Sequence, residues 1–212
     1  MRRLLAALLT TATAVILVPG TASASPRATT TQPCGAMQLT GNLPAPRPGT
    51  AVRQSISIGA DCQVVTGPAQ VVATPNSRAR LAAAYHTYSE MYDCCGIVMS
   101  ALYTDSTSST AGGAVTSSST SFSTHVNREP WNAGWSVRTA TSTGGCVTAC
   151  PSATYDHHAE FSYQGIFDAT GEWYYNIHDS RVVLNGDETA TCQQTVNLRH
   201  TFIGWNWVHG CG

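Results

Sequence analysis

Lysine is absent from the 212-residue sequence, and all eleven basic residues are arginine. This absence excludes Schiff-base chemistry and a lysine general base. Charged residues make up only 11% of the chain. Outside the first 24 residues, nine arginines stand against twelve acidic residues, so the basic surface of a nucleic-acid-binding protein is missing. We therefore expect no nucleic-acid partner.

Complete catalytic motifs are also missing. The sequence contains no Gly-x-Ser-x-Gly elbow, no His-Glu-x-x-His helix, no P-loop and no dinucleotide-binding fingerprint. His157 and Glu160 keep part of a zinc-site spacing, but on a strand these two residues point to opposite faces. The sequence therefore predicts no catalytic residue, no cofactor and no metal ion, and it weighs against an enzyme.

Long hydrophobic runs are confined to the N-terminus. Arg2 and Arg3 precede an apolar stretch from Leu4 to Val18, and Ala22-Ser23-Ala24 fits a signal-peptidase site. No later run approaches the ~20 apolar residues that span a bilayer. These features predict a signal peptide over residues 1–24 and a secreted, extracellular mature protein without a membrane partner.

Cysteine is plentiful, and all eight copies lie after the predicted leader. An even number in an exported chain predicts four disulfides, whereas a zinc site would need a Cys-x-x-Cys pair that the sequence lacks. The spacing favours two disulfides and leaves the pairing of the other four cysteines undecided. Two of these four are adjacent, and on a strand they would point to opposite faces and bond separate partners. The favoured pairs are Cys34–Cys62 and Cys192–Cys211; Cys94 and Cys95 would then bond Cys146 and Cys150, unless the last two bond each other.

The rest of the chain reads mainly as β-structure. Short alternating segments separated by Gly, Ser, Asn and Asp predict a disulfide-stabilised antiparallel sandwich or barrel-like fold over residues 51–212, a single domain. Residues 25–50 are rich in Pro and Thr and predict an extended arm. Residues 77–92 favour one helix by the spacing of Leu81, Tyr85 and Tyr88, although an alternating strand competes.

Tyr155–Leu184 predicts a long β-hairpin. Asp168-Ala169-Thr170-Gly171 supplies turn residues, and a four-residue loop there places Glu160 opposite Asp179 and His158 opposite Arg181. One face, with Tyr155, His157, Ala159, Phe161, Tyr163 and the even-numbered residues from Asn176 to Leu184, resembles a core face.

The opposite face of this hairpin is polar and provides the principal candidate site. In the expected register, two facing carboxylates would lie about 5 Å apart, near the spacing of a retaining glycosidase. The competing interpretation, which we favour, is a solvated sheet face on which His158 and Arg181 bridge the acidic residues. The candidate binding residues on this face are Asp156, His158, Glu160, Asp179 and Arg181.

Two tryptophans near the C-terminus add a second candidate. Trp205 and Trp207 share a face on an extended chain, where exposed indoles would stack on sugar rings. Burial in the core is the interpretation we favour for them. Together these features predict a secreted recognition module for an extracellular ligand such as a polysaccharide. The alternatives are a hydrolase on the polar hairpin face and a structural or inhibitory protein that acts through protein contacts.

Overall fold

Two antiparallel sheets make up the part of the chain that the computed structural model describes, residues 33–47, 49–74, 83–128, 134–164 and 173–212. All of these residues belong to the unit Thr31–Gly212. The first sheet has five strands, in the order β1 (Pro33–Leu43), β11 (Ala190–Phe202), β10 (Trp173–Asn185), β9 (Ser152–Gln164) and β8 (Ser136–Gly145).

The second sheet has seven strands and one irregular edge. Its main path runs β3 (Val64–Thr66), β2 (Thr50–Ile58), β12 (Asn206–Cys211), β5 (Ala83–Tyr92), β6 (Val98–Ala111) and β7 (Ala114–Val126), and β4 (Gln70–Ala73) also pairs with β2. A single 3-10 turn, η1 (Ala60–Cys62), lies between β2 and β3. Within the described ranges, none of the elements is a helix long and apolar enough to span a membrane.

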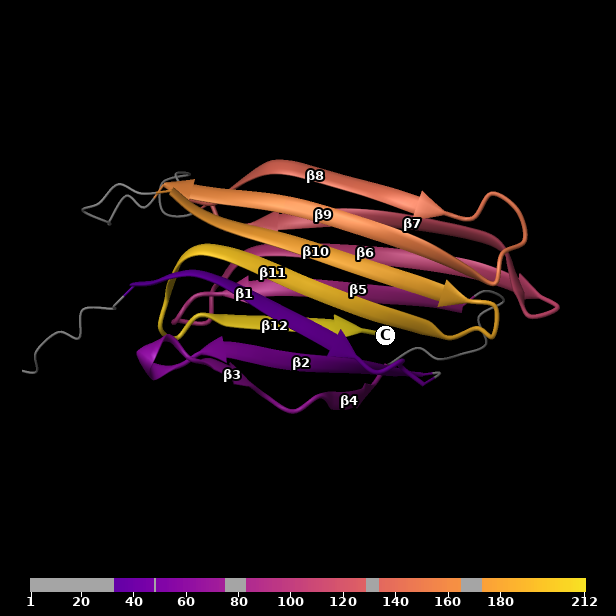
Figure 1. The fold of residues 1–212 in the computed structure, drawn as a ribbon, viewed down its shortest axis with the longest axis horizontal. Helices are drawn as coiled ribbons and strands as arrows, with labels where there is room; N and C mark the ends of the chain where they lie inside the picture. The colour runs from indigo at the N-terminus through magenta and orange to yellow at the C-terminus, as the bar shows by residue number, and fades with distance from the viewer. Residues whose placement is uncertain (1–32, 48, 75–82, 129–133, 165–172) are drawn as a thin grey trace, which may run out of the picture. The chain divides into compact units, whose positions relative to one another are not determined.

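The two sheets lie face to face, as Figure 1 shows, with β8 to β11 and β1 in front of β7, β6, β5, β12 and β2. Alternate residues of β9 and β10 are buried between the sheets, and the residues between them face outward. The predicted mainly β, antiparallel, sandwich-like fold is therefore confirmed.

The helix predicted near residues 77–92 is wrong where the structure describes it. Ala83–Tyr92 forms strand β5, which pairs with β6 and β12, and residues 77–82 lie outside the described ranges. Thr87, Ser89 and Met91 alternate on its inner face and are almost fully buried. Because two of these inward residues are polar, the strand alternation does not appear in hydrophobicity, and the spacing of its tyrosines resembles a helix instead.

Residues 33–43 of the predicted extended arm form β1, an edge strand that pairs with β11. Leu39 and Leu43 of this strand are buried. The segment therefore contributes a strand and part of the core to the five-stranded sheet.

Apolar side chains between the sheets form three clusters. The largest surrounds Phe161, Trp205 and Trp207 at one end, a second surrounds Tyr155 and Leu184, and a small third cluster includes the Cys192–Cys211 disulfide. Burial of these side chains supplies the main favourable contribution to folding of the unit.

A buried polar network connects the sheets. Trp207 Nε1 donates to Ser89 Oγ at 2.8 Å, and this oxygen lies 2.7 Å from His178 Nδ1. On the other side of the imidazole, Nε2 lies 3.2 Å from Ser100 Oγ, which also accepts from Asn176 Nδ2 at 2.9 Å. The pKa of His178 is lowered to about 3, chiefly because burial disfavours the charged ring. At neutral pH the network therefore contains an uncharged imidazole.

Two of the predicted disulfides are confirmed, and both connect the two sheets. Cys34 of β1 bonds Cys62 of η1, and Cys192 of β11 bonds Cys211 of β12. Such bonds restrict the unfolded chain and so stabilise the pairing of the sheets.

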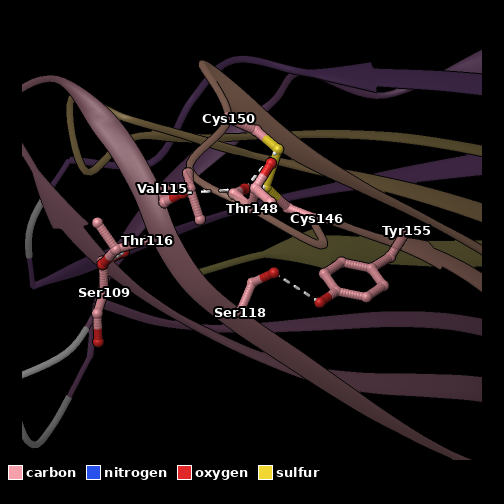
Figure 2. The surroundings of a disulfide bond; sticks show 8 residues. All are labelled: Ser109, Val115, Thr116, Ser118, Cys146, Thr148, Cys150 and Tyr155. Carbon is pink, nitrogen blue, oxygen red and sulfur yellow. Dashed lines mark hydrogen bonds between the residues drawn. A yellow bond between two sulfur atoms is a disulfide. The ribbon is translucent and has the colours of Figure 1, made fainter.

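The third disulfide joins Cys146 to Cys150, the alternative that the sequence left open. Figure 2 shows it at the loop between β8 and β9, where Cys150 also makes a backbone bridge to Val115 of β7. Tyr155 of β9 donates a hydrogen bond of 2.8 Å to Ser118, which also lies on β7. The loop is thereby attached to the opposite sheet.

The prediction of four disulfides is wrong in this structure, because Cys94 and Cys95 are free thiols. They lie in the turn between β5 and β6 rather than on a strand, so their side chains do not diverge to opposite faces. Three disulfides are consistent with an extracellular protein.

Candidate functional site

The pairing of β9 with β10 determines which polar side chains meet. His158 lies opposite Asp179, Asp156 opposite Arg181, and Glu160 opposite Ile177. This register differs by two residues from the one expected from a turn at 168–171, and those turn residues lie outside the described ranges. The predicted facing pair of Glu160 and Asp179 is therefore wrong.

A shift of two residues preserves the faces of both strands, because side chains alternate with a period of two. The predicted core face is accordingly confirmed. Its buried members are Tyr155, His157, Ala159, Phe161, Asn176, His178, Ser180, Val182 and Leu184, and Tyr163 is partly buried against them.

A His–Asp hydrogen bond and an Arg–Asp ion pair occupy the outer face in place of the expected carboxylate pair. His158 Nδ1 lies 2.7 Å from Asp179 Oδ1, with side chains 40% and 44% exposed. Arg181 donates from Nε to Asp156 Oδ1 at 2.6 Å and from Nη2 to Oδ2 at 3.3 Å. Because both pairs are exposed to solvent, they contribute little to the stability of the fold. Their main effect is to fix the direction of four polar side chains.

A groove of about 350 Å³ lies over these two pairs of residues. It crosses β8, β9, β10 and β11, and almost every side chain lining it is polar. The lining residues whose side chains point outward are Thr141, Thr143, Asp156, His158, Asp179, Arg181, Gln193 and Thr195; His157 and Ser180, whose side chains are buried on the inner face of the sheet, also border the groove. Four of the five residues predicted on the polar hairpin face line this groove; Glu160 is not among them.

Two rows of side chains cross the sheet in the groove, as the strand pairing shows. The first row is Thr141, His158, Asp179 and Thr195, and the second is Thr143, Asp156, Arg181 and Gln193. The sequence-based assignment missed the residues from β8 and β11. The Ser/Thr-rich stretch at 139–145 is a signal for the β8 residues, but it is equally typical of a solvated sheet surface.

Aromatic side chains continue the outer face of β10 beyond the groove. Trp173 is 42% exposed, and Tyr175 lies on the same side of the strand. The Arg199 guanidinium lies 5.5 Å from the centre of the Tyr175 ring, a distance typical of a cation–π contact. Along the strand, Tyr175 is roughly 13 Å from Asp179.

Trp205 and Trp207 lie in the core, 6% and 0% exposed. The Trp205 ring centre is 5.7 Å from that of Phe202, and Trp207 stacks on His209 at 4.1 Å. Because neither indole has an accessible face, these residues belong to the core, the interpretation favoured from the sequence.

The Ser89–His178 contact has the composition of a nucleophile and a base, but both residues are 0% exposed. A substrate therefore cannot reach them. Among the described residues, no three His, Cys, Asp or Glu side chains are grouped so that they could hold a metal ion. The groove on the outer face of the five-stranded sheet is thus the candidate site.

Comparison of the chain with protein-family models, with curated proteins and with solved structures finds no match.

Proposed function

We propose that the protein is a secreted recognition module that binds a carbohydrate in the groove across β8–β11. The observation that carries this proposal is the groove of about 350 Å³, in which the His158–Asp179 hydrogen bond and the Arg181–Asp156 ion pair hold four polar side chains. The predicted leader and the three disulfides support an extracellular location for this binding.

The chemistry of the lining matches a polyhydroxylated ligand. Asp156 and Asp179 supply acceptors, Arg181 supplies donors, and Thr and Gln side chains supply both. Sugar hydroxyl groups need donors and acceptors in alternation, whereas an anionic ligand would meet two carboxylates. Because these two contacts already hold the groups in place, ligand binding requires little further ordering of side chains.

The exposed ring of Trp173 and the neighbouring Tyr175 extend the surface along β10. Aromatic faces are apolar and pack against the C–H face of a sugar ring. A chain of several sugars would therefore find polar contacts in the groove and a stacking contact at one end of it. This arrangement favours an oligosaccharide or polysaccharide over a single sugar.

The proposal is tested by retention of the protein on insoluble chitin, cellulose and peptidoglycan, with assay of the supernatant for released sugar. Asp179→Asn removes a charge from the groove while keeping side-chain size, and Arg181→Gln removes a charge and shortens the side chain. We expect affinity to fall at least about tenfold in each, because a hydrogen bond to a charged group contributes about 1.5–3 kcal/mol.

The chain offers a matched control. His86 and Asp105 form a similar pair, with Nδ1 3.0 Å from Oδ1, on the outer face of the seven-stranded sheet. Asp105→Asn should leave retention unchanged. Retention that is equally weakened by the control, or no retention on any of the three polymers, would refute the carbohydrate proposal and direct attention to a protein partner.

A second candidate function is hydrolysis of a glycoside in the same groove. It is favoured by the diagonal placement of Asp179 relative to Asp156 across the β9–β10 pair. Diagonal neighbours lie roughly 7–8 Å apart at Cα, which is compatible with the carboxyl spacing of inverting rather than retaining glycosidases. Release of soluble sugar that disappears in Asp179→Asn would establish this function instead of simple binding.

A further inference from the structure

The turn between β5 and β6 is held by a set of local hydrogen bonds. Asp93 N donates to Ile97 O at 3.0 Å, and Gly96 N donates to Asp93 O at 3.3 Å. The Asp93 carboxylate accepts from the backbone N–H groups of Cys95 and Ile97, both at 2.8 Å. Gly96 adopts φ +80°, which a residue with a side chain rarely does. The turn therefore presents its two cysteines in a defined geometry.

Cys94 and Cys95 place their sulfur atoms 3.5 Å apart. Both residues are exposed, and they are the free cysteines of a chain whose other six are paired. The hydrogen bond with Cys95 is the main cause that raises the pKa of the Cys94 thiol. A disulfide needs about 2.05 Å between the sulfurs, so closure requires a movement of about 1.5 Å.

We propose that Cys94 and Cys95 are a redox-active modification site at which a vicinal disulfide forms and is reduced reversibly. Its reaction partner is a small-molecule or protein disulfide of the extracellular medium. The thiolate of one cysteine attacks the partner disulfide, forms a mixed disulfide and releases one partner thiolate. The thiolate of the neighbouring cysteine then attacks the cysteine sulfur of that bond and releases the second partner thiolate. The pair loses two electrons and two protons, and the partner disulfide is reduced to two thiols.

This bond is expected to be the most readily reduced disulfide of the protein. Consecutive Cα atoms across a trans peptide are about 3.8 Å apart, below the range of about 4.4–6.8 Å that disulfides prefer. The other three disulfides have Cα–Cα distances of 5.3, 6.2 and 6.1 Å, all inside that range. Strain and exposure both favour reduction, so the bond at 94–95 belongs to the labile class.

The reduced turn offers two neighbouring thiols on an open surface. Soft thiolate ligands prefer thiophilic centres, so the pair would also take up a trivalent arsenical through both sulfurs. This gives a probe, phenylarsine oxide, that distinguishes the reduced pair from the vicinal disulfide.

The experiment uses the oxidised, folded wild-type chain after incubation with glutathione disulfide. Free thiols are alkylated under denaturing conditions, and intact and peptide masses are measured. We expect no alkylated cysteine, and a peptide containing residues 94 and 95 that is lighter by two hydrogens. In a titration with dithiothreitol, alkylation should appear first at Cys94 and Cys95, at a concentration about tenfold or more below that needed for the other pairs.

Two controls separate this behaviour from general disulfide reduction. Cys146–Cys150 is also a short-range disulfide, with a sequence separation of 4, and should resist the first step. The double variant Cys94→Ser/Cys95→Ser should keep the other three disulfides and lose both the first reduction step and binding of phenylarsine oxide.

Three results would overturn the proposal. The first is two thiols that persist after incubation with glutathione disulfide. The second is a bond from Cys94 or Cys95 to another cysteine or to a second chain. The third is simultaneous reduction of this pair and Cys146–Cys150. None of these results bears on the carbohydrate groove, which lies on the five-stranded sheet, whereas the turn belongs to the seven-stranded sheet.

Discussion

Lowering the pH from 7 to 5 is expected to destabilise the fold, because histidines are buried between the sheets in the neutral form. His178 and His209 are both 0% exposed. Burial lowers the pKa of His178 to about 3 and that of His209 to about 4, from an ordinary value of 6.5. The side chains that contact these rings, including Ser89, Gln194 and Trp207, are uncharged and offer no compensation to an imidazolium.

The sign follows from proton binding in the two states. Below pH 6.5 the unfolded chain binds protons at these histidines, whereas the folded chain does not until the pH approaches the lowered pKa values. The free energy of unfolding therefore falls by about 1.4 kcal/mol per pH unit for each histidine. Between pH 6.5 and 5 this amounts to about 2 kcal/mol for each residue, or about 4 kcal/mol for the pair. That loss is a large part of a typical total of about 5–15 kcal/mol.

The assay is urea denaturation of the oxidised protein at several pH values between 7 and 5. Carboxylates contribute little in this range, because their unfolded pKa values lie near 4. His178→Gln keeps a polar side chain in the buried network, although it destabilises the protein at pH 7. It should reduce the slope of the unfolding free energy against pH by the contribution of about one proton.

The reasoning would be refuted by a free energy of unfolding that changes by less than about 1 kcal/mol between pH 7 and 5. It would equally be refuted if His178→Gln retained the full slope of the wild type. Either result would mean that the buried rings accept protons without loss of packing.

Two further predictions concern packing. In Gly41→Ala, the new Cβ would overlap the His209 ring, which is held by its stack on Trp207. We expect the free energy of unfolding to fall by about 1–3 kcal/mol, measured by urea denaturation. Replacing Cys192 and Cys211 together by serine removes a buried link between the sheets, and the sequence separation of 19 predicts a loss of about 3 kcal/mol in the same assay.

Controls for these substitutions come from neighbouring positions. Thr40→Ala changes the exposed residue next to Gly41 and should alter stability by less than about 0.5 kcal/mol. Joint replacement of Cys146 and Cys150 opens a much shorter loop and should cost about 1 kcal/mol less than loss of Cys192–Cys211. Equal losses from the two disulfides would contradict the loop-length argument.

The inner and outer faces of the hairpin could be predicted from the sequence, because alternation survives any register change of two residues. Tyr155 and Phe161 are inward and Asp156 and His158 outward in either register. The pairing itself depends on the turn. The predicted turn was in error by two residues, so Asp179 was expected opposite Glu160, whereas in the structure it lies opposite His158. The identity of the face is thus a robust inference, whereas the distance between two side chains across strands is not.

The polar interior limited the sequence-based assignment of β5. Its inward residues Thr87 and Ser89 hydrogen-bond to Thr104 and His178 inside the sandwich. Hydrophobic periodicity reports burial only where buried residues are apolar, so a strand with a polar inner face leaves an alternating signal too weak to exclude a helix.

Cysteine spacing was informative only in part. It identified the two disulfides that link the sheets, because Cys34 and Cys62 bracket one segment and Cys192 and Cys211 another. It did not reveal that Cys94 and Cys95 lie in a turn, where side chains of adjacent residues can approach each other. Strand geometry was the wrong premise for that pair.

The candidate groove and the buried polar network occupy alternate residues of the same two strands. His157 and His158 are adjacent, yet one faces the core and the other the groove, and His178 and Asp179 repeat the arrangement on β10. Substitutions can therefore address one function at a time: Asp179→Asn changes a groove side chain, whereas His178→Gln changes the interior. If ligand binding weakens on acidification in step with the unfolding free energy, loss of the fold is the cause. If it weakens while the protein remains folded, the buried histidines are not the cause.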